Sequence, residues 1–208
     1  MKEMSLTQCL LAKFCHDLAG NLTALSSGVD FFEDKNPETR RKAHELITLS
    51  TKQTVAKLGF FRAAYGTQKY DGEADLEEIR SLSSKLLQDR VVLDFNVRYS
   101  HQPEVFICAN TGKLILCMIY TAYTTLLYGG TIRVDIQKTK IGKKIIVTAA
   151  GKKIKYDVEK NRILSGDTSN SVLSPSNVHY YYTFLIMQRI SAKITTSLTD
   201  KEIQYTIE

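Results

Sequence analysis

The sequence lacks any run of apolar residues that could cross a bilayer, which takes about 20 consecutive positions. It also lacks the apolar core of a signal peptide, because Lys13, His16 and Asp17 interrupt the apolar residues near its start. We therefore expect a cytoplasmic protein with no membrane partner.

No two cysteines have the Cys-x-x-Cys spacing of common zinc and redox motifs. All of them lie among apolar residues, where a thiol behaves as a small hydrophobic side chain. We expect free thiols in the core and no zinc site for the four cysteines, Cys9, Cys15, Cys108 and Cys117.

The composition indicates an ordinary globular protein. Of the 208 residues, 43% are hydrophobic and 24% are charged, so disorder and fibrous repeats are not expected. The net charge of +6 comes from scattered Lys and Arg, without a signature of a nucleic-acid-binding module. We expect no nucleic acid, and a basic surface that suits acidic protein partners, such as the patches around phospho-accepting aspartates.

Apolar residues repeat at intervals of four and three near the N-terminus, which predicts a long helix with a coiled-coil-like seam. The seam consists of Leu11, Cys15, Leu18, Leu22, Leu25, Val29 and Phe32. A second helix follows, with Asn36 as its N-cap, Pro37 at its first position and Gly66 as its stop. Because two helices alone bury too little surface to be stable, we predict that the hairpin pairs with a second copy in a dimeric four-helix bundle.

His16 follows Cys15 and is turned about 100° from it around the helix axis, so its ring should reach solvent. Asp17 should turn further still toward water. A strip of small side chains lies on the face of His16, where another helix could approach closely: Ala19, Gly20, Thr23 and Ser27. An equally simple interpretation is that this strip packs within the same chain and that His16 is an ordinary surface residue.

The rest of the chain indicates a second domain. Residues 67–74 are polar and form a plausible linker between domain 1–66 and domain 75–208. We predict helices over 75–88, 111–128 and 176–191, and strands over 91–95, 104–109, 131–137, 144–149, 193–198 and 202–207. The whole is an α+β protein whose second part is an α/β sandwich.

Four short motifs resemble the ChpT-type histidine phosphotransferases of alphaproteobacterial phosphorelays. They are Cys15-His16-Asp17-Leu18, Phe60-Phe61-Arg62 followed by Ala64 and Gly66, Gly129-Gly130-Thr131, and Tyr180-Tyr181. The resemblance implies a homodimeric hairpin that carries the phosphorylated histidine, followed by a degenerate histidine-kinase-ATPase-like domain that binds no nucleotide. His16 then takes the place of the phosphoacceptor.

The sequence itself argues against kinase activity. A histidine-kinase nucleotide site needs an Asp-x-Gly-x-Gly loop and a second glycine-rich loop that lets backbone amides approach the phosphates. Neither is present, since Gly129-Gly130 is a lone pair and Gly151 has no Asp ahead of it. We expect no kinase reaction and no cofactor, with Mg²⁺ only on a partner receiver domain.

The resemblance implies that His16 passes a phosphoryl group between receiver-domain aspartates of a hybrid histidine kinase and of response regulators. Imidazole suits this task because its neutral form is nucleophilic near neutral pH. Asp17 could orient the ring and Lys13 could pair with the phosphate, or both could simply be part of a solvated helix face.

Two alternatives stay open. His16-Asp17-x-x-x-Asn21 resembles a pattern of another sensor-kinase class in which an amide orients a hydrolytic water, so Asn21 could assist a receiver phosphatase or could merely be exposed. A non-catalytic dimeric adaptor that binds a response regulator or a kinase is the second alternative.

Overall fold

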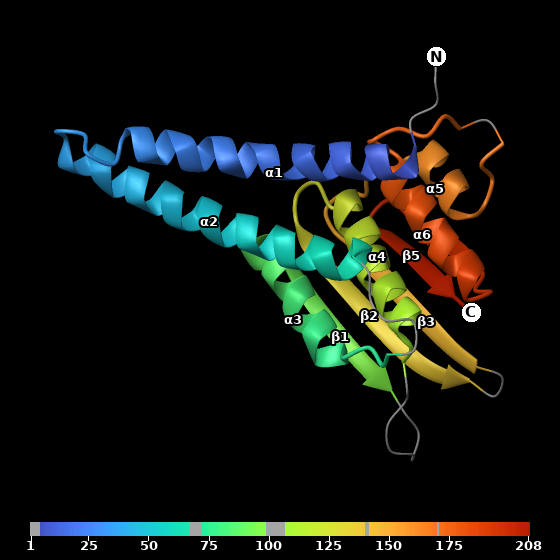
Figure 1. Ribbon diagram of the computed structural model, residues 1–208. Helices are drawn as coiled ribbons and strands as arrows, with labels where there is room; N and C mark the ends of the chain where they lie inside the picture. The colour runs from blue at the N-terminus through green and yellow to red at the C-terminus, as the bar shows by residue number, and fades with distance from the viewer. Residues whose placement is uncertain (1–4, 67–71, 99–106, 140–141, 170) are drawn as a thin grey trace.

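The computed structural model describes residues 5–66, 72–98, 107–139, 142–169 and 171–208. A helical hairpin projects from a mixed sheet that helices cover on one face (Figure 1). The elements are α1 (Leu6–Asp30), α2 (Pro37–Tyr65), α3 (Leu76–Leu87), the short 3₁₀ helix η1 (Gln88–Arg90), β1 (Val91–Arg98), α4 (Ala109–Thr125), β2 (Gly130–Thr139), β3 (Gly142–Ala150), α5 (Val158–Leu164), α6 (Val178–Arg189), β4 (Ile194–Leu198) and β5 (Glu202–Ile207).

Local signals set the ends of the hairpin helices. The Ser5 hydroxyl accepts a hydrogen bond from the amide of Gln8, whose side chain returns to the Ser5 amide in a capping box. Asn36 caps α2 and Pro37 occupies its first turn, as the sequence predicts. The two helices approach closely at Gly28, where an added Cβ would lie 2.7 Å from Cγ1 of Ile47.

The sheet has the strand order β1-β2-β3-β5-β4, in which β1 pairs with β2 in parallel and the other pairs are antiparallel. Helix α4 packs across the covered face and contacts α2, α3 and α6 as well as β2 and β3. It is apolar on nearly all sides, as expected of a helix enclosed by neighbours, and six consecutive residues from Leu114 to Ile119 are at most 2% exposed.

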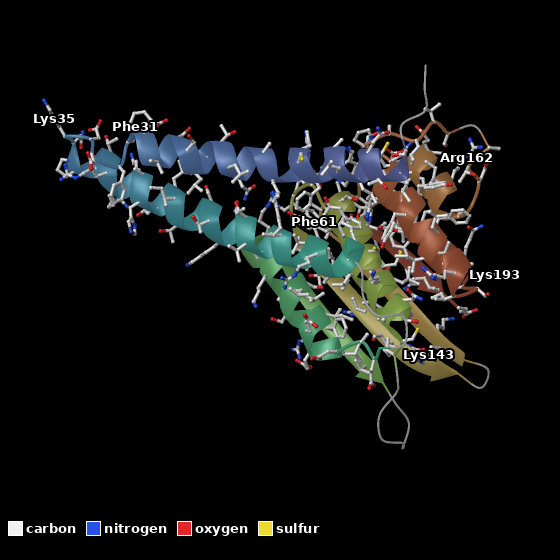
Figure 2. The ribbon with its side chains drawn as sticks, in the orientation of Figure 1. Phe31, Lys35, Phe61, Lys143, Arg162 and Lys193 are labelled. Carbon is white, nitrogen blue, oxygen red and sulfur yellow. The ribbon has the colours of Figure 1, made fainter. Side chains whose placement is uncertain are left out.

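The base of the hairpin joins this core. Phe60, Phe61 and Ala64 near the end of α2 are buried in the same hydrophobic cluster as α4. Figure 2 places Phe61 where α2 meets the C-terminal elements and Phe31 at the distal end of the hairpin. One end of the hairpin is therefore anchored, while Phe31 at the other end is 53% exposed.

The structure confirms most of the predicted elements and corrects three points. Helix α5 has no counterpart in the prediction. Of the strand predicted over 104–109, residues 104–106 lie outside the described residues, Cys108 forms only an isolated bridge with Glu73, and Ala109 already begins α4. Of the predicted linker 67–74, residues 67–71 lie outside the described residues.

The third correction concerns Cys15. Cys9 and Cys117 are buried and Cys108 is half-buried, but Cys15 is exposed in the single chain. Most of the predicted seam is exposed with it, because α2 packs against other residues of α1; large exposed side chains of the seam are Leu11, Leu22, Val29 and Phe32. None of the helices in the described ranges is long and apolar enough to span a membrane.

A buried histidine ties the hairpin to the C-terminal helices. His179 of α6 is 1% exposed, and its Nε2 lies 3.1 Å from the carbonyl oxygen of Cys117 and 2.9 Å from Oγ1 of Thr121. Because a carbonyl oxygen only accepts, Nε2 carries the proton, and Nδ1 accepts a hydrogen bond of 2.8 Å from the Tyr65 hydroxyl. The neutral ring thus joins α2, α4 and α6.

Burial gives this ring a measurable pH dependence. Desolvation, with a smaller contribution from the positive charge of Lys13, lowers the pKa of His179 to about 3, whereas an unfolded chain has a histidine pKa of about 6.5. Between these values only the unfolded state takes up a proton, so the free energy of unfolding falls as the pH falls.

We predict that His179 accounts for a loss of about 2 kcal/mol in the free energy of unfolding between pH 7 and pH 5. Urea unfolding of wild type and His179→Gln at both values measures this loss, which the variant should lack. His44→Gln, at an exposed position, is the control and should show the same pH dependence as wild type. Equal pH dependence in His179→Gln and wild type would contradict the assignment.

Candidate functional site

His16 lies on α1 with its imidazole in solvent. The side chain is 89% exposed, and its only polar contact in the described part of the chain is a long one of 3.5 Å from Nδ1 to Oδ1 of Asp17. This exposure agrees with the expectation from the sequence. A ring in this position is accessible to a partner molecule from outside the chain.

Asp17 points the other way, which corrects the expectation that it faces water. Its side chain is 16% exposed and forms a salt bridge of 2.9 Å with Nζ of Lys13. The hydroxyl of Tyr120, on α4, donates a hydrogen bond of 3.0 Å to Oδ2 of Asp17. Burial, with the charge of Asp17 as a further cause, raises the pKa of Tyr120, so the hydroxyl keeps the proton that it donates.

Lys13 is also turned inward. Its side chain is 17% exposed, and Nζ lies 5.3 Å from the centre of the Tyr120 ring in addition to its bond to Asp17. Neither Lys13 nor Asp17 is a solvated residue of an open helix face. Together with Tyr120, they fix the turn of α1 that presents His16.

Asn21 is engaged between the hairpin helices. Its Nδ2 donates to Oε1 of Gln53 over 2.9 Å, and its Oδ1 accepts from Nζ of Lys57 over 2.7 Å. It is therefore half-buried and not merely exposed. Each end of the amide has one partner on α2, so the side chain is held between the hairpin helices.

Lys57 is a second residue that holds the α1 turn of His16 and Asp17, and it was not predicted from the sequence. Besides Asn21, its ammonium donates a hydrogen bond of 2.9 Å to the backbone carbonyl of Asp17. Burial lowers the pKa of Lys57, an effect that the charge of Asp17 opposes. The available signal was a lysine on a helix face that otherwise packs against α1.

The strip of small side chains beside His16 is open. Ala19, Gly20 and Thr23 are exposed and Ser27 is half-buried. A Cβ added at Gly20 would meet no atom within 4 Å. Packing within the described part of the chain does not cover the strip, so a partner can reach the surface next to the imidazole.

The described residues contain no cluster of three or more His, Cys, Asp or Glu side chains that could hold a metal ion.

Comparison with known proteins gives concordant results. The family model described as the histidine phosphotransferase C-terminal domain matches residues 76–202. The protein phosphotransferase ChpT of Brucella abortus (strain 2308) is 21% identical over 209 residues, which cover 100% of this chain and 97% of that protein.

Solved structures extend the likeness to the fold. A bacterial phosphotransferase determined at 1.7 Å has a TM-score of 0.84 at 20% identity and covers 98% of this chain and 95% of its own. The histidine kinase AdeS of Acinetobacter baumannii has a TM-score of 0.49 at 10% identity, with 92% and 95% of the two chains covered. At a TM-score of 0.84, the hairpin and the sheet domain both have counterparts in the bacterial phosphotransferase.

Loss of the Lys57 ammonium should weaken the hairpin. We predict that Lys57→Met lowers the free energy of unfolding by about 1–3 kcal/mol, because Asn21 and the Asp17 carbonyl lose a charged hydrogen-bond donor. Lys52→Met removes the same charge from an exposed position of α2 and should cost less than about 0.5 kcal/mol. Equal urea midpoints for the two variants would show that the Lys57 contacts do not stabilise the turn.

Proposed function

This chain belongs to the histidine phosphotransferase family, and from this premise we propose that His16 carries a phosphoryl group between the aspartates of receiver domains. The family assignment gives the chain a role in the phosphotransfer reactions of two-component signalling. The choice of His16 as carrier, and of receiver aspartates as donor and acceptor, is our inference.

The observation that carries the proposal is the contrast between His16 and its neighbours. The imidazole is 89% exposed, while the side chains of Lys13 and Asp17 are 17% and 16% exposed and bonded to each other. Because Tyr120 and Lys57 hold the same helix turn, the ring projects from a fixed support. A fixed nucleophile loses little freedom when it meets an in-line phosphoryl donor.

The transfer is an exchange of one bond at phosphorus. The lone pair of a neutral imidazole nitrogen attacks the acyl phosphate, a P–N bond forms, and the P–O bond to the receiver aspartate breaks to return its carboxylate. The second step reverses these events on another receiver. Mg²⁺ on the receiver would neutralise charge on the transferring group, so the transferase supplies only the ring and a matching surface.

The contact with Asp17 favours Nε2 as the nucleophile. Nδ1 is the nitrogen that faces Oδ1 of Asp17, and a carboxylate in that position favours a proton on Nδ1. The lone pair is then on Nε2, the ring nitrogen further from the helix backbone. An incoming receiver would meet this nitrogen first.

We also propose that the functional form is a homodimer. Large apolar side chains are exposed along both hairpin helices, and contiguous patches of this kind mark interfaces. Pairing with a second copy would bury them in a four-helix bundle. They are Leu11, Leu22, Val29 and Phe32 on the α1 side and Leu46, Leu49, Val55 and Leu58 on α2.

The principal experiment transfers labelled phosphate from a phosphorylated receiver domain to the purified protein. Wild type should acquire a label that is stable in base and labile in acid, as expected of phosphohistidine, and His16→Ala should acquire none. His44→Ala, a matched change at an exposed histidine of α2, should behave as wild type. Label on His16→Ala would contradict the proposal, and a bound receiver that labels neither protein would favour the adaptor.

The dimer is tested by the mass of the protein in solution. We predict that wild type sediments as two chains and that Val29→Lys sediments as one, because a charge would enter the buried seam. Val172→Lys is the control, since Val172 is 70% exposed and lies outside the hairpin. A monomeric wild type, or a dimer that is unaffected by Val29→Lys, would contradict pairing through the seam.

A further inference from the structure

A small cavity lies beside the turn of α1 that carries His16. Its volume is about 120 Å³, and α1, α4, α5, α6 and the segment after β3 all contribute to its wall. The hairpin and the C-terminal elements thus share one pocket, which is partly open to solvent. Anything bound there would contact both.

Three lysines bring positive charge to this wall. They are Lys13 of α1, Lys155 of the segment after β3, and Lys160 of α5. The wall has one carboxylate, that of Asp157. Even with Asp17 counted as the partner of Lys13, positive charge exceeds negative charge. The side chains of Lys13 and Lys160 are only 17% and 25% exposed, so water screens them less than surface charges.

The lysine ammonium groups have N–H donors for further hydrogen bonds. Lys160 pairs with Asp157 over 3.0 Å and lies 5.8 Å from the centre of the Tyr180 ring, and each ammonium has three N–H donors. Lys155 is exposed and forms no salt bridge within the described residues. Of the three lysines it is therefore the one without a carboxylate partner in the described part of the chain.

The hydroxyl hydrogens of Tyr120, Thr124 and Tyr180 in the wall are already committed, and Oγ of Ser176 lies 2.9 Å from Oγ of Ser174, where either hydroxyl could be the donor. Oγ1 of Thr124 donates to the carbonyl oxygen of Thr121 over 2.7 Å, so the Tyr180 hydroxyl must donate to Thr124 in their contact of 2.8 Å. Tyr120 donates to Asp17. The donors that remain for a ligand are therefore mainly cationic, which selects negative charge.

The volume of the cavity further restricts which ligands can bind. Pockets that enclose drug-sized molecules measure about 300–1,000 Å³, so 120 Å³ is too small for a whole nucleotide. A tetrahedral oxyanion with a few waters fits such a volume. Two or more negative charges would suit a wall with three lysines better than the single charge of chloride.

We propose that this cavity is a binding site for a phosphate-like oxyanion, held by Lys13, Lys155 and Lys160, which braces the base of the hairpin against α4, α5 and α6. Such an ion binds only the folded arrangement of these elements, so a higher concentration of the ion raises the free energy of unfolding. The site does not depend on the proposed transfer reaction. His16 is not among the residues that line the cavity, so the ligand proposed is free inorganic phosphate.

The test compares inorganic phosphate with chloride at matched ionic strength on the full chain. Phosphate should raise the Tm of wild type by about 2–4 °C above chloride. Calorimetric titration should give an affinity for phosphate that Lys155→Gln weakens about tenfold. Lys153→Gln makes the same charge change at an exposed position two residues away and should match wild type.

His16→Ala isolates this proposal from the transfer reaction. The variant should bind free phosphate as wild type does, because the site is built from the lysines. Equal stabilisation by phosphate and chloride, equal affinity in Lys155→Gln and wild type, or loss of binding in His16→Ala would each overturn the site, whatever the result of the transfer assay.

Discussion

The hydrogen bond from Tyr120 to Asp17 is the contact on which the arrangement of the site depends. It joins residues 103 positions apart, so that α4, the most enclosed helix of the C-terminal part, holds one turn of α1. Adjacent residues of a helix point about 100° apart. With Asp17 drawn toward α4 and Lys13 paired to it, His16 is left on the side that faces solvent. Its exposure is thus a consequence of the burial of its neighbours.

The two parts of the molecule are stabilised in different ways. The sheet and its helices form a closed hydrophobic core, in which buried His179 satisfies both ring nitrogens. The distal hairpin has no such core within one chain, since Phe31 and Val29 are 53% and 59% exposed. A second copy would complete it, and the open strip at Ala19, Gly20 and Thr23 would leave room for a receiver beside His16. The hairpin can then serve both partners, on separate faces.

Much of this architecture follows from the sequence, because helix caps and apolar periodicity act over a few residues. Asn36, Pro37 and the seam predict the hairpin, and the exposure of His16 follows from helical geometry alone. The orientation of Asp17 could not be predicted in this way, since it is set by Tyr120 from a distant helix. Cys15 was assigned to a core that a single chain does not form. Helix α5 has seven residues and two buried apolar side chains, too few for a periodic pattern.

The most direct test of the account is to map the phosphorylated residue by mass spectrometry after a phosphorylated receiver domain has reacted with the wild-type protein. We predict one phosphoryl group per chain, attached to His16, with His44 unmodified although it is also exposed. A phosphoryl group on a different residue would contradict the account. So would a receiver that loses its phosphate while this protein gains none, because the reaction would then be hydrolysis and not transfer.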